Sequence, residues 1–133
     1  MTTTLTILGC GSSSGVPRFG GDWGRCDPTN PKNRRRRCSV LIEKKSTTGS
    51  SCVLIDTSPD MRDQLLSAGV TNVDGVLYTH DHADHTHGID DLRMVAYAMK
   101  KRVDVYFDAA TGKSLRERFA YCFKTPPGSE YTP

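Results

Sequence analysis

The sequence lacks the features that mark several common classes of protein. It has no apolar run of the roughly 18 to 20 residues that a membrane-spanning helix needs. The start, Met1–Leu8, has neither the basic region nor the apolar region of a signal peptide. The five cysteines include no C-x-x-C pair, so we expect no disulfide framework and no cysteine-rich structural zinc site. We therefore expect a cytoplasmic protein without membrane contact, in which most cysteines are small buried hydrophobic residues.

Histidine is absent from most of the chain and concentrated in one segment. All four histidines lie between His80 and His87, and Asp84 brings the metal-capable side chains in these eight positions to five. The residues before them, Val73–Thr79, are mostly apolar, which predicts a buried strand. A rigid strand can hold a short loop in a defined direction, so the segment is a candidate functional site. A loop that is polar by accident is the alternative.

The spacing within this segment predicts two neighbouring cations. His80 and His82 are two residues apart, so in an extended backbone they point to the same side. Asp84 and His85 are adjacent and begin to turn away, so they would hold a second cation. Imidazole and carboxylate ligands suit zinc, manganese or iron. A structural site for a single metal stays open as an alternative.

The order of predicted elements indicates an α/β architecture. A loop rich in Gly, Pro, Asn and Arg is predicted at about residues 9–37, and loops of this length in compact domains are usually functional or disordered. Ser58 and Pro59 have the pattern of a helix start. The predicted strands are 2–8, 39–43, 51–56, 73–79 and 103–107, and the predicted helices are 58–68, 88–100 and 109–123. An irregular tail is expected from Thr125 onward.

The predicted loop contains two candidate binding features. Backbone amides of Gly11–Gly15, with the hydroxyls of Ser12, Ser13 and Ser14, would hold a substrate phosphate or ribose. The alternative is a tight turn where the first strand ends. The block Arg34–Arg37 would attract phosphate or nucleic acid, or it is a solvated loop. RNA is the less secure partner, because the sequence lacks the aromatic pattern of single-strand binders.

Four stretches of the sequence resemble one family. His80-x-His82-x-Asp84-His85 resembles the H-x-H-x-D-H signature of the metallo-β-lactamase superfamily. Leu8–Pro17 resembles the first-strand loop of its phosphodiesterase branch, which includes the ribonuclease Z enzymes and the PhnP-type cyclic phosphodiesterases. Leu54–Pro59 resembles the family's strand that ends in an Asp before a helix, and His87–Arg93 resembles the H-G-[LI]-D-D-L-R continuation of the PhnP-like group. The resemblance covers nearly the whole chain.

The resemblance implies a fold and a set of ligands. The fold would be half of an αβ/βα sandwich, with a mixed sheet and helices on one face. His80 and His82 would bind the first of two divalent metal ions, and Asp84 and His85 the second, with Asp84 as the catalytic residue. Asp56 would be an outer partner that fixes a ligand ring, or else a charge partner for the following helix. His87 has no ligand role in the signature and is read as a nearby hydrogen-bonding group.

The chain also departs from the family pattern. Members are about twice as long, and their second half supplies further ligands, whereas this chain has no histidine after His87. Asp104 and Asp108 follow too soon to match the family's bridging aspartate. We therefore expect residues 1–133 to be the N-terminal half of such a domain. A truncated or proteolysed chain is the favoured explanation, with a natural half-protein as an alternative. A homodimer is expected through the open sheet face.

A second departure lies in the predicted loop. The PhnP-like enzymes use cysteines there for a structural zinc. Gly21 and Trp23 stand where cysteines are expected, and only Cys26 remains. We therefore expect that structural zinc to be absent.

These observations favour a metal-dependent phosphodiesterase. Two metal ions would activate water against a small phosphodiester, a nucleotide or a cyclic phosphate. The alternatives are a hydrolase of a thioester, lactone or β-lactam on the same scaffold, and a non-catalytic half-domain that binds metal or nucleotide.

Overall fold

The computed structural model describes residues 1–125 and 127–128. Its strands are β1 (Thr2–Gly9), β2 (Ser39–Ser46), β3 (Gly49–Ile55), β4 (Gly75–Leu77) and β5 (Asp104–Tyr106). Its helices are α1 (Met61–Ser67), α2 (Ala83–Thr86), α3 (Leu92–Met99), α4 (Ala109–Arg118) and α5 (Ala120–Phe123), with 3-10 turns η1 (Phe19–Gly21), η2 (Pro31–Asn33) and η3 (Ile89–Asp91). The end of the predicted half-domain and most of its predicted tail, residues 126 and 129–133, lie outside the described range.

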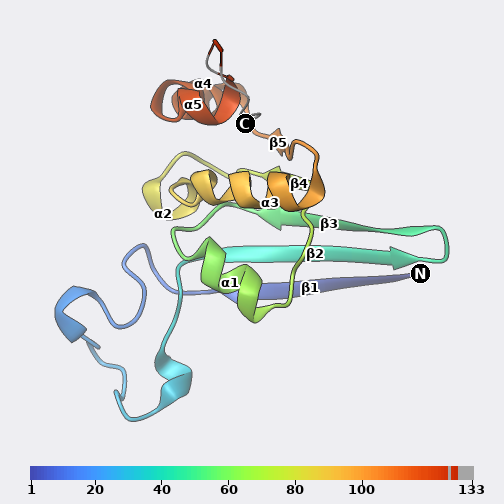
Figure 1. Ribbon diagram of the computed structural model, residues 1–133. Coiled ribbons are helices and arrows are strands. Elements are labelled where there is room, and N and C mark those ends of the chain that lie inside the picture. The colour runs from blue at the N-terminus through green and yellow to red at the C-terminus, as the bar shows by residue number, and fades with distance from the viewer. Residues whose placement is uncertain (126, 129–133) are drawn as a thin grey trace.

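The five strands form one mixed sheet in the order β1-β2-β3-β4-β5 (Figure 1). The first three strands are antiparallel neighbours, and β3, β4 and β5 run parallel. These directions bring the ends of β1, β3, β4 and β5 and the start of β2 to one edge of the sheet. The β1–β2 loop (residues 10–38), Asp56 and the histidines therefore all follow or precede strands at that edge.

The helices cover one face of this sheet, as predicted. Leu41, Leu54, Val76 and Val105 are register partners across four strands, and the first three of them are at most 1% exposed. Met61 and Leu65 of α1 and Leu92 of α3 belong to the same apolar core. Figure 1 shows α1 and α3 lying over this face. Burial of this row is what ties the strands that carry the candidate site to the helices.

The opposite face of the sheet is apolar and exposed. Ile7, Val40, Ile55, Leu77 and Tyr106 are register partners across all five strands. Ile7 is 64% exposed and Tyr106 is 59% exposed, with no helix of the described chain over them. Alternation along each strand therefore places apolar residues on both faces, and the described residues cover only one of the two.

Several predicted boundaries are wrong for physical reasons. The hairpin turn is much shorter than the predicted connection of residues 44–50, because Lys44 and Lys45 still pair with β3. Helix α1 begins at Met61 and not after Ser58, and the Asp60 side chain at its N-cap makes no capping bond. Phe119 (φ −126°, ψ 40°) breaks the predicted helix 109–123 into α4 and α5.

The cysteine prediction is also wrong. Cys52 is the one buried cysteine, Cys38 and Cys122 are half-buried, and Cys10 and Cys26 are exposed. All five are free thiols. Among the helices of the described chain, none combines the length and apolarity needed to cross a membrane.

Candidate metal centre

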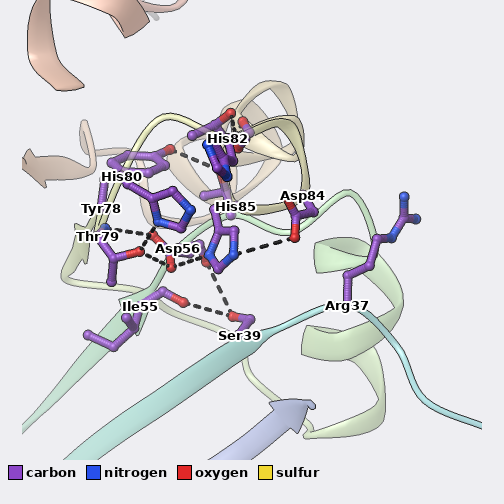
Figure 2. Close-up of polar contacts among 12 residues, drawn as sticks. Arg37, Ser39, Ile55, Asp56, Tyr78, Thr79, His80, His82, Asp84 and His85 are labelled. Carbon is purple, nitrogen blue, oxygen red and sulfur yellow. Dashed lines mark hydrogen bonds and ion pairs between the residues drawn. The ribbon is translucent and has the colours of Figure 1, made fainter. Parts of the chain in front are cut away.

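The structure brings the predicted metal ligands together beyond the end of β4. His82, at the N-cap of α2, has extended backbone (φ −63°, ψ 150°), and Asp84 and His85 fall in that short helix. The His80 ring centre lies 4.5 Å from that of His82 and 4.1 Å from that of His85. Figure 2 shows the three rings gathered on one side of the sheet edge, with Asp84 next to His85.

Asp56 is the buried centre of the site. It follows β3 with a left-handed backbone (φ 61°), which Asp tolerates better than most residues because its short side chain can hydrogen-bond locally. The buried Ser39 hydroxyl lies 3.0 Å from the Ile55 carbonyl oxygen and 3.2 Å from that of Asp56, on either side of this turn (Figure 2). The Asp56 side chain is only 4% exposed. The left-handed turn directs its carboxylate to the histidine segment.

The carboxylate of Asp56 organises that segment through three hydrogen bonds. Its Oδ1 accepts from the backbone N–H of Thr79 at 2.8 Å. Its Oδ2 lies 2.7 Å from the Thr79 hydroxyl and 2.7 Å from Nδ1 of His85. The described contacts of this carboxylate include none to α1, so they favour the predicted partner of a ligand ring over the helix-charge alternative.

The same network assigns the tautomers of two histidines. Since ionised Asp56 only accepts, Nδ1 of His85 must carry the proton. The Thr79 hydroxyl uses its own proton on Asp56, so it accepts from Nδ1 of His80 at 2.9 Å. Both rings therefore keep an Nε2 lone pair available, which is the arrangement that ligating histidines need.

These donors are of the kinds that hold a divalent cation. Oδ2 of Asp84 lies 3.4 Å from Nε2 of His85, and the His80 and His82 rings are also neighbours. Neutral imidazole nitrogen with carboxylate oxygen is a donor set for zinc, manganese or iron. Within residues 1–125 and 127–128, no three His, Cys, Asp or Glu side chains are already gathered as one ligand group. The described residues thus place imidazole and carboxylate donors near one another without forming a complete ligand set.

Main-chain contacts fasten the segment to the start of the β3–α1 connection. The buried Thr57 donates its N–H to the His85 carbonyl at 2.8 Å and accepts from the Gly88 N–H at 2.9 Å. A Cβ at Gly88 would lie 2.1 Å from the Ser58 carbonyl oxygen, so only glycine fits this close approach. The sequence contains this glycine, but its contact with Ser58 becomes visible only in the fold.

Helix α4 holds the outer side of the segment. Arg118 donates to the Asp81 carbonyl at 2.6 Å, and its Nη2 lies 3.0 Å from Nε2 of His87. Ser114 donates to the Asp81 carboxylate at 2.7 Å, and this bond lowers the pKa of Asp81. His87 is therefore engaged with α4, consistent with a hydrogen-bonding role. Sequence reasoning missed Ser114 and Arg118, because nothing near them in the chain points to the histidines.

The aspartates considered as makeshift ligands have other positions. Asp108 is the N-cap of α4, where its Oδ1 accepts from the Thr111 N–H at 2.7 Å and its pKa is lowered by that bond. Asp104 is exposed at the start of β5. The structure therefore gives Asp108 a helix-capping role and does not bring Asp104 to the histidines.

The serine segment of the β1–β2 loop forms a tight turn, one of the two alternatives considered for it. The N–H of Gly15 donates to the Ser12 carbonyl at 2.8 Å, so Ser12–Gly15 is a closed turn. The Gly11 N–H donates to the Arg36 carbonyl at 2.8 Å, so two of the expected phosphate-binding amides are already used. Ser12, Ser13 and Ser14 are exposed. The hydroxyls of Ser12 and Ser14 lie 3.2 Å apart, within hydrogen-bond distance of each other.

The arginine block fastens the loop to α1. Arg36 donates to Asp63 at 2.8 Å and to the Ser67 hydroxyl at 2.9 Å. Arg37 donates to both carboxylate oxygens of Asp60, at 2.9 Å from Nε and 2.5 Å from Nη2. This hydrogen bonding raises the pKa of Arg37 and lowers that of Asp60. The solvated-loop alternative is therefore wrong for these two arginines.

Comparison with known proteins places this geometry in a family. The model of the beta-lactamase superfamily domain matches residues 52–133. A crystal structure of a diphosphatase from the PhnP family is 40% identical with a TM-score of 0.81, covering 92% of this chain and 48% of that one. An octanoyltransferase of Porphyromonas gingivalis is 39% identical over 121 residues, which cover 91% of this chain and 24% of that protein.

A more distant structure shares the fold alone. Human tRNase Z, short form, is 17% identical with a TM-score of 0.57, covering 93% of this chain and 42% of that one. The chain thus spans about half of the solved structures that it matches, or less. Members of the matched family are generally hydrolases and bind metal ions. The chain belongs to the metallo-β-lactamase superfamily, and within it is similar to the PhnP family.

Proposed function

We propose that the protein carrying this chain is a metal-dependent hydrolase of a phosphodiester or diphosphate bond in a nucleotide or cyclic phosphate. The observation that carries the proposal is the Asp56 network, which leaves Nε2 of both His80 and His85 free beside Asp84. The 40% identity to a PhnP-family diphosphatase supports phosphate chemistry. The octanoyltransferase match concerns about a quarter of that protein, so it brings no acyl-transfer activity here.

The residues of this chain would divide the work between holding and orienting. His80 and His82 would hold one divalent ion, and Asp84 and His85 the other. Bound zinc, manganese or iron would supply Lewis acidity and a nucleophilic water near neutral pH. Asp56 keeps the protons of His80 and His85 on Nδ1, and Thr79 carries this effect to His80. Ser12, Ser13 and Ser14 would donate hydroxyl hydrogen bonds to substrate oxygens.

Hydrolysis of bis(p-nitrophenyl) phosphate by the full-length protein that carries this chain, with added Mn²⁺ or Zn²⁺, tests the proposal. We expect turnover, and a loss of at least about a hundredfold in His82→Ala, as removal of a metal ligand predicts. His87→Ala is the matched histidine control, because His87 is engaged with Arg118, and it should lose much less activity. Full activity in His82→Ala would refute the metal assignment. Cleavage of a thioester or lactone without phosphodiester turnover would refute the substrate class.

The partner expected for the open sheet face stays a proposal. The exposed row containing Ile7, Leu77 and Tyr106 supports a second copy of the chain at that face, since apolar patches of this kind promote association. Sedimentation of the chain should show a dimer that Ile7→Lys dissociates. A monomeric wild-type chain would contradict the proposal.

A further inference from the structure

We propose that a pocket in the β1–β2 loop binds the nucleobase of a nucleotide substrate, with Trp23 as the stacking surface. The proposal rests on the proposed function, because it names a further part of the same substrate. It concerns side chains that the metal centre does not use.

The pocket has the size of one ring system. Its volume is about 230 Å³, and its walls include Ser12, Ser14, Val16, Arg18, Asp22 and Trp23. Sites for whole drug-sized ligands start at roughly 300 Å³. A pocket of this size therefore suits a base, with the sugar and phosphate left outside it.

Trp23 is placed as a stacking platform. The ring is half-buried in an otherwise exposed part of the loop. The Arg34 guanidinium lies 5.6 Å from the ring centre, and Arg34 is not among the residues lining the pocket. Trp23 therefore lines the pocket and also lies beside Arg34. An indole that lines an open polar pocket can stack on any base, because every base has a π-face.

The rim of the pocket supplies polar groups for the edge of a base. Arg18 pairs with Asp22 at 2.9 Å, and both are more than half exposed. The hydroxyls of Ser12 and Ser14 lie 3.2 Å apart and are also exposed. A guanidinium and a carboxylate provide both donors and acceptors, as base edges require, and the serine hydroxyls stay with the substrate oxygens assigned to them above.

The pocket is held in shape before any ligand arrives. Val16 and Arg35 exchange two backbone hydrogen bonds of 2.9 Å, which join the two arms of the loop. Arg18 and Asp22 are also joined by a backbone bond of 2.8 Å. A preformed pocket loses less conformational entropy on binding than a flexible loop would.

The loop also connects the pocket to the metal centre. Arg34, which covers Trp23, is three residues from Arg37, and a fully extended chain of that length spans about 10 Å. Figure 2 shows Arg37 beside Asp84. The pocket and the histidines thus belong to the same edge of the sheet, and the proposal requires the phosphate of a nucleotide with its base on Trp23 to reach from this loop toward the histidines.

Fluorescence gives a direct test, because Trp23 is the one tryptophan of the chain. The chain is titrated in EDTA with adenosine 5′-monophosphate, ribose 5-phosphate or inorganic phosphate. We expect saturable quenching by adenosine 5′-monophosphate and none by the two probes without a base. No quenching by adenosine 5′-monophosphate, or equal quenching by ribose 5-phosphate, would overturn the proposal.

Two variants and a control sharpen the test. Ser14→Leu fills the pocket and retains Trp23, so we expect its affinity for adenosine 5′-monophosphate to fall at least about tenfold. Phe19→Ala removes a fully exposed aromatic from the same loop outside the pocket, and its affinity should equal that of the wild type. Unchanged affinity in Ser14→Leu would contradict the proposal.

The outcome is separable from that of the proposed function. His82→Ala should lose hydrolysis and retain the fluorescence response, because Trp23 does not touch the histidines. If the protein hydrolyses phosphodiesters without the fluorescence response, the nucleobase site is wrong and the metal centre stands. If the fluorescence response occurs without hydrolysis, the nucleobase site stands and the proposed hydrolase function is wrong.

Discussion

The histidine segment (residues 80–87) and the β1–β2 loop lie at the same edge of the sheet but are held by different kinds of interaction. Two rings of the histidine segment, those of His85 and His80, depend on the buried carboxylate of Asp56, directly or through Thr79. The loop is fastened by arginines on the surface of α1, where the Asp63 side chain is 71% exposed. Hydrogen bonds in a dry interior are strong and set atomic positions, whereas exposed ion pairs are weakened by water and salt.

The difference separates two roles. The buried network fixes which ring nitrogens of His80 and His85 carry protons. The loop is held at the same edge, with its pocket, by ion pairs and backbone bridges. Substitutions on the two sides of the edge test this contrast.

Asp56→Asn should cause the largest change. The variant keeps the shape and the tolerance for a left-handed backbone, but it loses an acceptor that His85 and Thr79 share. We expect zinc affinity, measured by calorimetry, to fall about 10- to 100-fold, as loss of such an outer partner generally causes. Asp63→Asn makes the same chemical change on the loop side and should leave zinc affinity unaltered. Equal affinities in all three proteins would remove Asp56 from its assigned role.

Gly88→Ala should destabilise the histidine side of the edge. Its new methyl group would meet the Ser58 carbonyl oxygen at 2.1 Å, so the backbone must shift. We expect the free energy of unfolding in urea to fall by about 1–3 kcal/mol, the usual cost of overpacking. Gly75→Ala is the control, because its nearest neighbour at 3.2 Å is a Tyr106 side-chain atom that can move. A larger loss in Gly75→Ala would contradict the argument.

Arg37→Ala should loosen the loop. Both side chains of the Arg37–Asp60 pair are less than one third exposed, and the variant leaves Asp60 without its partner. We expect a loss of about 1.5–3 kcal/mol in unfolding free energy, the range for hydrogen bonds to charged groups. Arg35→Ala removes a neighbouring arginine whose side chain makes a long, 3.5 Å bond to the Arg34 carbonyl, so it should cost little. Equal losses in the two variants would show that Arg37 is not the anchor.

Acid should release the same anchor. The Arg37 hydrogen bond lowers the pKa of Asp60, so the stability it contributes is full above the unfolded value of 3.8 and is lost as pH falls through the folded value. Trp23 emission should therefore be constant from neutral pH to about 4 and change below it. Asp60→Asn should abolish that change. A transition that persists unaltered in Asp60→Asn belongs to another group.

Arg36→Ala should have the smallest effect. Its partner Asp63 is largely exposed, and such pairs contribute about 0–1 kcal/mol. The effect on unfolding should shrink further in 1 M salt, where screening is strong. A loss of unfolding free energy equal to that of Arg37→Ala, and insensitive to salt, would contradict the expected difference between the exposed Arg36–Asp63 pair and the less exposed Arg37–Asp60 pair.

The sequence predicted the parts of the fold that follow from local patterns. Alternation in Thr2–Leu8 and the apolar run before His80 correctly indicated strands. Helix ends were less predictable, because the Asp60 carboxylate binds Arg37, which lies 23 residues earlier in the chain. The cysteines were misjudged for the same reason, since exposure at a loop or strand end depends on what packs above it.

The candidate site divides along the same line. The chain order itself determined which side chains would stand together after β4, since His80, His82, Asp84 and His85 are neighbours in sequence and a strand presents them at one edge. Tertiary structure alone decided which ring nitrogen of His80 and of His85 stays free. That choice depends on Asp56, on Thr79 and on a left-handed turn that Ser39 of β2 stabilises. Tertiary structure also decided the roles of Arg118 and Gly88, whose partners are distant in the chain. The surroundings of Trp23 likewise depend on the shape of the folded loop. The spacing of residues that are close in the chain can be predicted from the sequence, whereas the direction of hydrogen bonds and the burial of side chains arise only when separate segments pack together.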